Sequence, residues 1–468
     1  MKKIIVRNFA MIRYQELDLD ANLNIIIGPQ ASGKSTLMKL IFFCRKLRDY
    51  LLAYLTNPNN FQNVDPSRRT VNLNNYLKRR FMDYFGTTRH MPRFEVRFYF
   101  NVEANRYVTL TLDENGYLHF SFEETMWRDI SSYLRQTERR YQKALSGNFP
   151  DYTYLADYTR NYYTHALGSL FDDWEELIYV PAGRNILAIL SDAQLTRTEA
   201  LPAESMQSNL YPPKSSDDNA PEMDMFFQDF IRLIRFIRPR FGVSLSEVIQ
   251  EYSLMQDYTK EDAKRRPGLR NAELAIPIIK SVLKADYRYD PDGEKLFYTE
   301  QDYVKLMFAS SGQQEVLWIL LLIFLKILED RHVFLVLEEP ESHLFPEAQK
   351  HVVELVALLI HSTNSHVVIT THSPYILTSA NLCAYSAKVE NDSKGEQSRE
   401  PVVAAHLRVS PDKYDAFMTN PDEEQGENAP FLTRIKDEDG LTDATKIDGV
   451  SDEINEQMDE LIELEVRS

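Results

Sequence analysis

The chain has few of the residues that build cross-links or metal centres. Only two of its 468 residues are cysteine, Cys44 and Cys383. Two cysteines are too few for a disulfide scaffold or a cysteine-ligated zinc site. Because disulfides persist in oxidising compartments, the expected location is a reducing cytoplasm.

Long hydrophobic runs are missing as well. A membrane-spanning helix needs about 18 to 20 consecutive apolar residues, and the longest apolar run, residues 316–328, is interrupted by Lys326. This run is expected to be a buried helix. The N-terminal residues 1–6 lack the small-residue cleavage site of a signal peptide and begin a strand pattern instead. The chain also shows no internal repeat and no sustained heptad pattern, so we expect neither a membrane partner nor a long coiled coil.

The charge is unevenly distributed. The formal net charge is −17, and residues 411–468 contain 18 Asp and Glu against 5 Lys and Arg. The remaining residues 1–410 are therefore close to neutral for their length. The acidic segment is interpreted as a solvated surface, with repulsion of DNA, mimicry of DNA or docking on a basic partner as alternatives.

The most informative motif follows the apolar strand Ile25–Ile27. It has the pattern G-x-x-x-x-G-K-[ST] and runs into an apolar helix, which is the context of a phosphate-binding loop. Its residues, all expected to contact a nucleotide, are Gly28, Pro29, Gln30, Ala31, Ser32, Gly33, Lys34, Ser35 and Thr36. The glycines permit the turns, and successive backbone N–H groups form an anion site at a helix N-terminus. Lys34 is expected to reach the β- and γ-phosphates of ATP, and Ser35 to offer its hydroxyl to Mg²⁺.

Two apolar runs downstream end in polar residues. Residues 333–337 precede Glu338 and Glu339, and residues 367–369 precede Thr370, Thr371 and His372. Such runs predict parallel strands that are buried on both faces and carry their chemistry at their carboxyl ends. Glu338 is expected to hold Mg²⁺ through water, Glu339 to orient the attacking water, and His372 to donate a hydrogen bond to the γ-phosphate. Phosphoryl transfer requires such positioning and charge neutralisation.

This set of motifs resembles the ATP-binding-cassette ATPases, in the branch of SMC, RecF and OLD-like proteins labelled AAA15 or AAA21. The resemblance covers roughly residues 1–50 and 285–380. It implies that Ser310, Ser311, Gly312 and Gln313 form the signature motif, which in this family closes over the ATP of a second subunit. ATP would then lie between two copies of the chain.

The chain departs from the family pattern at several positions. Glu338 stands where most cassette ATPases have Asp, and Leu344-Phe345 stands near the usual Asp of the inter-subunit contact. The glutamine that senses Mg²⁺ has no clear counterpart, and Gln62 is only a candidate. Arg184 lies in a Pro-Ala-x-Arg segment seen in this branch, where it is expected either to touch phosphate or the partner subunit, or to form a structural ion pair.

The expected fold class is α/β, a P-loop ATPase fold like the heads of SMC and RecF proteins, with an added antiparallel β-layer and a helical insertion. Residues 1–124 and 285–400 would form the split ATPase domain and residues 125–284 the mainly helical insertion. Residues 401–468 would be an acidic segment ending in an amphipathic helix at residues 454–464. The β-layer is predicted at residues 94–100, 107–112 and 117–122.

The leading functional interpretation is a slow, regulatory ATPase that dimerises or oligomerises on ATP and controls a separate effector. OLD nucleases carry a TOPRIM domain, but only about 95 residues follow His372 and no HNH motif is visible. Stand-alone OLD-like ATPases resemble the ATPase subunits of anti-phage systems such as PARIS and Septu, so the expected partner is a separately encoded TOPRIM or HNH nuclease.

A DNA repair ATPase of RecF or SMC type that binds DNA directly is the main alternative. A transporter subunit and an ATP-operated scaffold with negligible turnover are two further possibilities. Three basic clusters could contact DNA phosphates, although each is more often a solvated surface. They are Lys78-Arg79-Arg80, Arg232/Arg235/Arg238 and Lys264-Arg265-Arg266.

Overall fold

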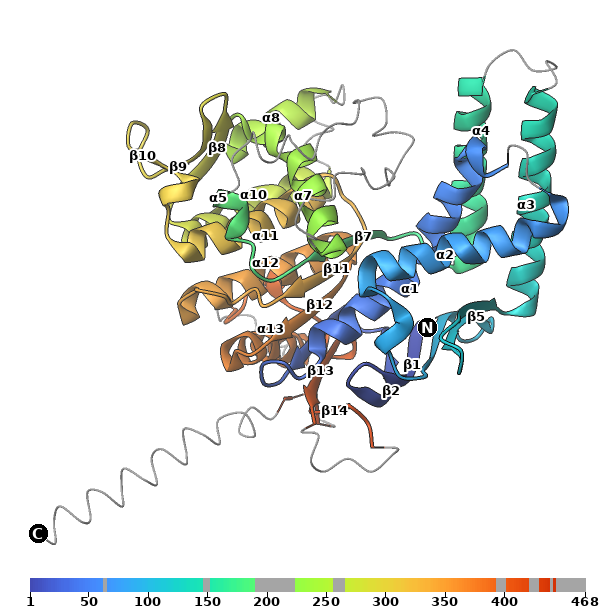
Figure 1. The fold of residues 1–468 in the computed structure, drawn as a ribbon. Helices are drawn as coiled ribbons and strands as arrows, with labels where there is room; N and C mark the ends of the chain where they lie inside the picture. Colours follow the sequence, from blue (N-terminus) through green and yellow to red (C-terminus); the bar gives the residue numbers. More distant parts are fainter. Residues whose placement is uncertain are drawn as a thin grey trace, which may run out of the picture.

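A six-stranded, mostly parallel sheet forms the centre of the computed structural model, which describes residues 1–61, 65–145, 152–189, 224–255, 266–392, 401–420, 429–437 and 441–442. The strand order is β14-β13-β3-β12-β11-β7, and only β14 is antiparallel to its neighbour. The strands are β3 (Leu23–Ile27), β7 (Glu176–Val180), β11 (Val333–Glu338), β12 (His366–Thr371), β13 (Tyr414–Thr419) and β14 (Leu432–Arg434). The parallel arrangement places the carboxyl ends of β3, β11 and β12 at one edge (Figure 1).

Helices cover both faces of this sheet, which explains why its central strands are apolar throughout. Leu335 and Leu337 face one hydrophobic cluster, whereas Phe334 and Val336 face another. The first cluster contains α10 (Pro267–Leu283), α11 (Ser311–Leu328) and α12 (Pro346–Thr363) together with α13 (Pro374–Asp392), and the second contains α1 (Lys34–Thr56). The prediction of a buried helix at residues 316–328 is confirmed.

Helix α11 is also the one described helix that is long and apolar enough to cross a membrane. Of its 18 residues, 89% are buried inside the protein. Its composition therefore matches that of a core helix packed between the sheet and its neighbours.

A second sheet lies beside the nucleotide-loop helix. Its strands are antiparallel in the order β2-β1-β4-β5-β6. They are β1 (Lys3–Phe9), β2 (Ile12–Asp18), β4 (Glu95–Asn101), β5 (Arg106–Leu112) and β6 (Leu118–Phe122). Alternate residues of β4 are buried, the pattern of a sheet with one face on the core. The added β-layer is thus present, and the N-terminal hairpin is part of it.

The remaining elements are mainly helical. Helices α3 (Glu124–Leu145) and α4 (Tyr152–Phe171) stand side by side at one end of the molecule (Figure 1). The others are α2 (Arg69–Phe85), α5 (Ile186–Ile189), α7 (Met225–Ile237) and α8 (Leu245–Met255). A small sheet of order β10-β9-β8 combines β8 (Asp286–Asp290), β9 (Gly293–Phe297) and β10 (Tyr303–Lys305). Its β8–β9 hairpin precedes residues 310–313, the expected signature motif, in the chain.

The six-stranded sheet contains strands that lie outside the residue limits expected for the ATPase domain. Strand β7 lies within the expected helical insertion, and β13 and β14 lie beyond residue 400. β13 pairs with β3, next to the phosphate-binding loop. Its residues Tyr414–Thr419 mix polar and apolar side chains within an acidic region, so no apolar run marked them. The expected domain limits at 125, 284 and 400 therefore do not coincide with the limits of the sheet.

Several sequence expectations fall outside the described residues. These are Gln62, Lys264-Arg265 and the amphipathic helix at residues 454–464.

Candidate functional site

The phosphate-binding loop connects β3 to α1. Gly33 has φ 90° and Ala31 has φ 57°, so both residues are in the left-handed region. Helix α1 begins at Lys34, and no side chain caps its N-terminus. The N–H groups of a first turn have no partner within their own helix and carry partial positive charge. The loop is therefore shaped to receive an anion such as a phosphate.

Both glycines of the G-x-x-x-x-G-K-[ST] pattern lie where an added Cβ would meet a neighbouring side chain. A Cβ on Gly28 would lie 1.9 Å from the Thr419 Oγ1 atom, and one on Gly33 would lie 2.5 Å from the Met11 Sδ atom. Strand β13 thus approaches the loop closely from one side. This contact could not be anticipated from the G-x-x-x-x-G-K-[ST] pattern alone.

Lys34 lies at the centre of the site, with 4% of its surface exposed. Its Nζ atom donates to the carbonyl oxygens of Gly28 and Pro29 at 2.9 and 2.8 Å, and lies 3.5 Å from His372 Nε2. Burial lowers the pKa of Lys34, although the nearby carboxylates led by Glu339 act in the opposite direction. The ammonium therefore sits between the loop and the acidic end of β11.

Glu338 ends β11, and its side chain is almost completely buried. Its Oε1 accepts a hydrogen bond from the Tyr179 hydroxyl at 2.7 Å, and its Oε2 accepts one from the Ala182 N–H at 3.2 Å. Burial and the Glu338 charge together raise the pKa of Tyr179 well above its usual range, so this hydroxyl remains a donor. The position is fixed by two strands, β11 and β7, that are 159 residues apart in the chain.

Glu339 and His372 contact one another across the ends of two strands. Glu339 has φ 45°, a left-handed conformation that is uncommon for a residue with a side chain. Its Oε1 lies 3.1 Å from His372 Nε2. Strained backbone of this kind persists where the surrounding structure holds it, and it is frequent at functional sites. The structure thus brings Lys34, Glu339 and His372 together.

Glu341 is a site residue that the sequence expectations did not include. Its Oε1 accepts hydrogen bonds from the Thr371 hydroxyl at 2.6 Å and from the His372 N–H at 2.7 Å. Its Oε2 is buried and has no hydrogen-bond partner. The signal was present in the sequence, since Glu341 follows Glu338 and Glu339 in the same acidic run.

The donor set fits Mg²⁺ and a nucleotide. Mg²⁺ prefers oxygen ligands from one or two carboxylates and a substrate phosphate. Ser35 supplies a hydroxyl in the first turn of α1, while Glu338 and the unpartnered Glu341 oxygen supply carboxylate character at the end of β11. The buried Lys34 ammonium complements the phosphate charge. The expected roles of Ser35 and Glu338 as metal ligands remain predictions.

Residues 310–313, which are expected to form the signature motif, occupy a separate place in the same chain. Ser310 caps helix α11 through a capping box with Gln313, and the Gln313 side chain donates to the Leu283 carbonyl at 2.7 Å. The Gln313 side chain thus contacts α10 and Tyr298, the residue after β9, and not the phosphate-binding loop. The N-terminus of α11 packs closely against the segment after β11, since a Cβ on Gly312 would lie 2.6 Å from the His343 carbonyl oxygen.

Replacing Gly312 with alanine is expected to displace the start of α11 from the His343 carbonyl. Alanine favours a helix more than glycine by roughly 0.5 to 1 kcal/mol, so the fold should be kept. We expect ATP hydrolysis to fall about tenfold or more because the signature motif moves, while nucleotide binding by the single subunit persists. Hydrolysis assays and fluorescent-nucleotide titrations measure the two effects. Gly242→Ala is the control, since the nearest atom to its added Cβ lies 3.7 Å away. Equal activity of the two variants would contradict the prediction.

Arg184 is completely buried. Its guanidinium contacts backbone carbonyls and Glu315, so the structural ion pair is the alternative that its geometry favours. None of the hydrogen bonds of Arg184 goes to residues 28–36 of the phosphate-binding loop.

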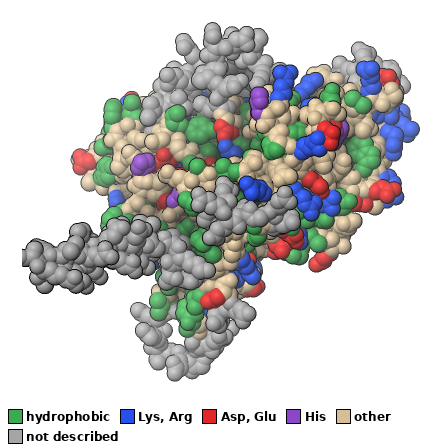
Figure 2. All heavy atoms as spheres, turned by 60° about the horizontal axis from the view of Figure 1, so that its bottom comes forward, with side chains coloured by type: hydrophobic (Ala, Val, Ile, Leu, Met, Phe, Trp, Pro, Cys, Tyr) green, Lys and Arg blue, Asp and Glu red, His purple; other side chains and the backbone are tan. Residues whose placement is uncertain are grey.

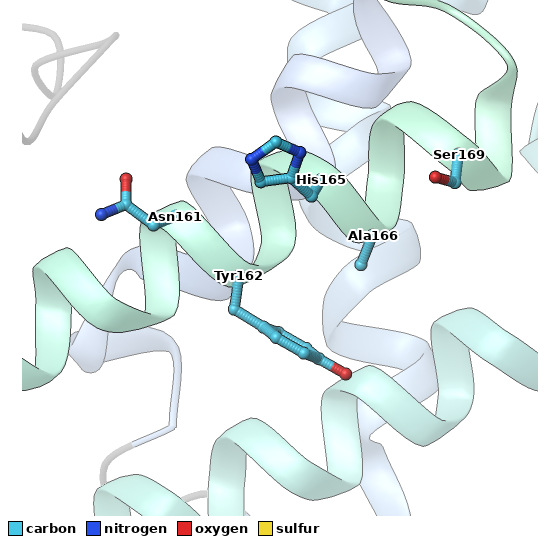
Figure 3. Close-up of a pocket in the computed structure, with 5 residues that line it drawn as sticks. All are labelled: Asn161, Tyr162, His165, Ala166 and Ser169. Atoms are coloured by element: carbon cyan, nitrogen blue, oxygen red, sulfur yellow. The ribbon is translucent and has the colours of Figure 1, made fainter.

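A depression with a volume of about 500 Å³ lies elsewhere, on helix α4. Figure 3 shows the five side chains that line it arising from this one helix. The lining residues are Asn161, Tyr162, His165, Ala166 and Ser169. They include no carboxylate and no lysine or arginine, so this depression lacks the acidic and basic pair that Glu339 and Lys34 supply at the loop site.

Comparison with known proteins supports a nucleotide-dependent enzyme. The family model described as "AAA ATPase domain" matches residues 1–377. No curated protein gives a significant match.

The solved structures that are similar at low identity include three heads of SMC proteins. An SMC head bound to the C-terminal winged-helix domain of ScpA is 11% identical, covers 92% of this chain and 96% of that one, and has a TM-score of 0.38. The SMC head domain of Thermotoga maritima is 12% identical, with coverages of 81% and 90% and a TM-score of 0.33. An SMC head with an extended coiled coil, bound to the C-terminal domain of ScpA from Pyrococcus furiosus, is 10% identical, with coverages of 97% and 100% and a TM-score of 0.34.

Proposed function

The chain belongs to the AAA ATPase domain family, and we propose that it is an ATP-binding and ATP-hydrolysing subunit of a bacterial anti-phage complex. In this proposal ATP joins two copies of the chain, and the joined state controls a separately encoded effector. The effector class we propose is a TOPRIM or HNH nuclease. The ATPase class itself follows from the family.

One observation carries the proposal of an ATP-joined dimer. Lys34, Glu339 and His372 converge at one site, whereas Ser310–Gln313 make their hydrogen bonds to another part of the same chain. Each copy therefore offers a phosphate-binding half and a separate signature half. Two copies arranged head to tail would complete two sites, as the resemblance to cassette ATPases implies.

Each residue of the phosphate-binding half has a distinct task in the proposed hydrolysis. Mg²⁺ would neutralise charge on the β- and γ-phosphates when bound. Lys34 contributes a buried positive charge beside the phosphates. Glu339 orients the water and accepts its proton, and His372, held by Glu341 through its backbone N–H, supplies a hydrogen bond to the phosphate edge. Positioning and electrostatic stabilisation account for most catalysis in this type of reaction.

The defence role is supported by the resemblance of the motif set to OLD-like ATPases, and it is tested by identifying the partner. The tagged protein is purified from cells that carry its native operon, with and without phage challenge, and co-purifying proteins are identified by mass spectrometry. A nuclease from the same operon is the expected result. Recovery of the protein with DNA alone, and unaltered phage survival when the gene is deleted, would contradict the proposal.

Direct DNA binding is the second candidate, and one segment favours it. Residues 66–94, which include α2, contain seven Lys and Arg against one Asp. Arg68, Arg79 and Arg89 of this segment are exposed. On the face drawn in Figure 2, however, basic side chains are interspersed with acidic ones. If DNA is the partner, duplex affinity must rise with ATP and fall steeply with salt. Filter binding at two salt concentrations distinguishes this function from control of a protein effector.

A further inference from the structure

Arg184 is a buried cation with an unusual set of partners, most of them backbone carbonyl groups. Its guanidinium donates to the carbonyls of Pro181 at 2.6 Å, Glu338 at 2.7 Å and Glu339 at 3.0 Å. Its Nε donates to the Glu315 carbonyl at 2.9 Å, and its own backbone N–H donates to the Glu315 Oε2 at 3.0 Å. Arg184 thus connects its own segment with residues 338–339 and with Glu315, which are distant in sequence.

The first segment that it holds is the strained end of β11. Glu339 has φ 45°, and its carbonyl no longer lies in the ladder of the sheet after β11 ends at Glu338. A strained residue costs on the order of 1 to 3 kcal/mol and needs support from its surroundings. Charge-assisted hydrogen bonds are among the strongest such supports. Arg184 contacts the main chain of the expected metal ligand Glu338 and of the expected catalytic residue Glu339 through their carbonyl oxygens.

The second segment is the start of α11. Glu315 lies one turn beyond Ser311, the first residue of that helix, and its side chain is buried. Its carboxylate lies 3.4 Å from the Arg184 Nε. Burial lowers the pKa of Arg184, and the negative charge of Glu315 is the largest influence that raises it. An arginine nevertheless remains protonated in proteins. The buried charge of Arg184 is therefore balanced by a residue of the helix that carries the signature motif.

A further contact joins the start of α11 to the segment that follows β11. The Gly312 backbone packs against the His343 carbonyl, which lies in the segment between Glu339 and α12. The start of α11 thus meets the end of β11 at two places, through Arg184 and through His343. A shift of α11 cannot leave the position of Glu339 unchanged unless these contacts break.

We propose that Arg184 is a positioning residue that couples the two halves of the ATPase. It joins the Glu338-Glu339 segment of the phosphate-binding half to the helix that begins with the signature motif. Engagement of that helix by a second copy would then set the carboxylates for hydrolysis within the same chain, which links turnover at the two sites. This inference rests on the proposed function, and its test includes a measurement that does not depend on hydrolysis.

Arg184→Lys and Glu315→Gln test the coupling. Lysine keeps the charge but loses the planar fork that reaches several carbonyls at once. Glutamine keeps the shape of Glu315 and removes its charge. We expect kcat to fall about 10- to 100-fold, as misplacement of catalytic groups by about 1 Å can produce. We expect KM and the affinity for a fluorescent ATP analogue to change less than about threefold, because the phosphate-binding loop is not altered.

Arg45→Lys is a matched control. Arg45 is buried like Arg184 and forms its ion pairs with Asp173 and Glu175, away from the residues of the ATP site. Weaker pairing by the lysine, which lacks the planar fork of arginine, should lower the melting temperature without lowering kcat in the folded protein. If Arg184 had a merely structural role, the two lysine variants would behave alike.

Hydrogen exchange provides the readout that is independent of activity. In the full-length wild type, Mg²⁺ and ATP are expected to slow amide exchange both around Glu339 and across residues 311–320. In Arg184→Lys and Glu315→Gln the slowing should remain at the phosphate-binding loop but disappear from residues 311–320. In Arg45→Lys it should remain at both places.

The outcomes separate this inference from the proposed function. Bound ATP without hydrolysis by the wild type would overturn the proposed enzyme, and the exchange data alone would then decide the coupling. Slowed exchange at residues 311–320 in both site variants, or equal loss of kcat in Arg184→Lys and Arg45→Lys, would overturn the coupling. If Arg184→Lys fails to fold, Glu315→Gln is decisive, since it leaves all carbonyl contacts of Arg184 available.

Discussion

Replacement of Lys34 by alanine is expected to weaken the affinity for ATP by at least about two orders of magnitude. The Nζ atom is buried within the loop, donates to the carbonyls of Gly28 and Pro29, and lies beside His372. A hydrogen bond to a charged group contributes roughly 1.5 to 3 kcal/mol, and an ammonium that meets two phosphates makes more than one such contact. Every 1.4 kcal/mol corresponds to about tenfold in affinity.

The measurement is a titration with a fluorescent ATP analogue, accompanied by a phage survival assay on cells that carry the operon. Lys39→Ala is the control, because Lys39 lies on the same helix but pairs with Asp224 and not with the loop. The control should bind ATP as the wild type does and should protect cells. Tight binding by Lys34→Ala would show that the loop is not the nucleotide site, and protection by a variant that cannot bind ATP would separate the ATPase from defence.

The parts of the site that were predictable are those encoded by short stretches of sequence. The strand before Gly28, the loop and α1 were expected together because glycine spacing and an apolar run specify them locally. Strands β11 and β12 were expected for the same reason, since both are continuous apolar runs that end in polar residues. Their parallel pairing places Glu338 beside Thr370, so Glu339 and His372 meet once the strands align.

The parts that were not predictable depend on partners distant in the chain. Tyr179 reaches Glu338 across 159 residues, and Arg184 reaches Glu315 across 131. Strand β13 joins β3 from a position almost 400 residues later, without an apolar run to mark it. Such contacts are set by the order of strands in the sheet. A sequence pattern predicts that a segment forms a strand, but it does not predict which strand pairs with it.

The departure of Glu338 from the usual Asp has a structural reason. The side chain accepts hydrogen bonds from the Tyr179 hydroxyl at 2.7 Å and the Ala182 N–H at 3.2 Å. Glutamate is one methylene longer than aspartate, which brings its carboxylate within reach of both donors on the β7 side. The longer residue thus joins the expected metal-binding position to the segment that carries Arg184. The same segment then holds Glu338 by its side chain and by its backbone.

Replacement of Glu339 by glutamine is expected to separate ATP binding from hydrolysis. Glutamine keeps the size of the side chain but cannot accept a proton from water, and proton transfer by a positioned group contributes roughly 10²- to 10⁴-fold to a rate. We therefore expect phosphate release to fall at least about 100-fold while the affinity for ATP stays within about threefold. Since hydrolysis would no longer separate the joined copies, light scattering should detect a persistent dimer in ATP.

The control for this change is Glu347→Gln, an exposed carboxylate in the first turn of α12. It should release phosphate at the wild-type rate and should dissociate after ATP is consumed. The conformation of Glu339 makes the comparison informative, because its left-handed backbone and its contact with His372 fix the carboxylate in one place. Wild-type hydrolysis by Glu339→Gln would exclude this residue as the water-positioning group. Loss of ATP binding in the same variant would instead assign Glu339 to the binding of the nucleotide, and a monomeric variant in ATP would contradict the dimer that the separate signature half requires.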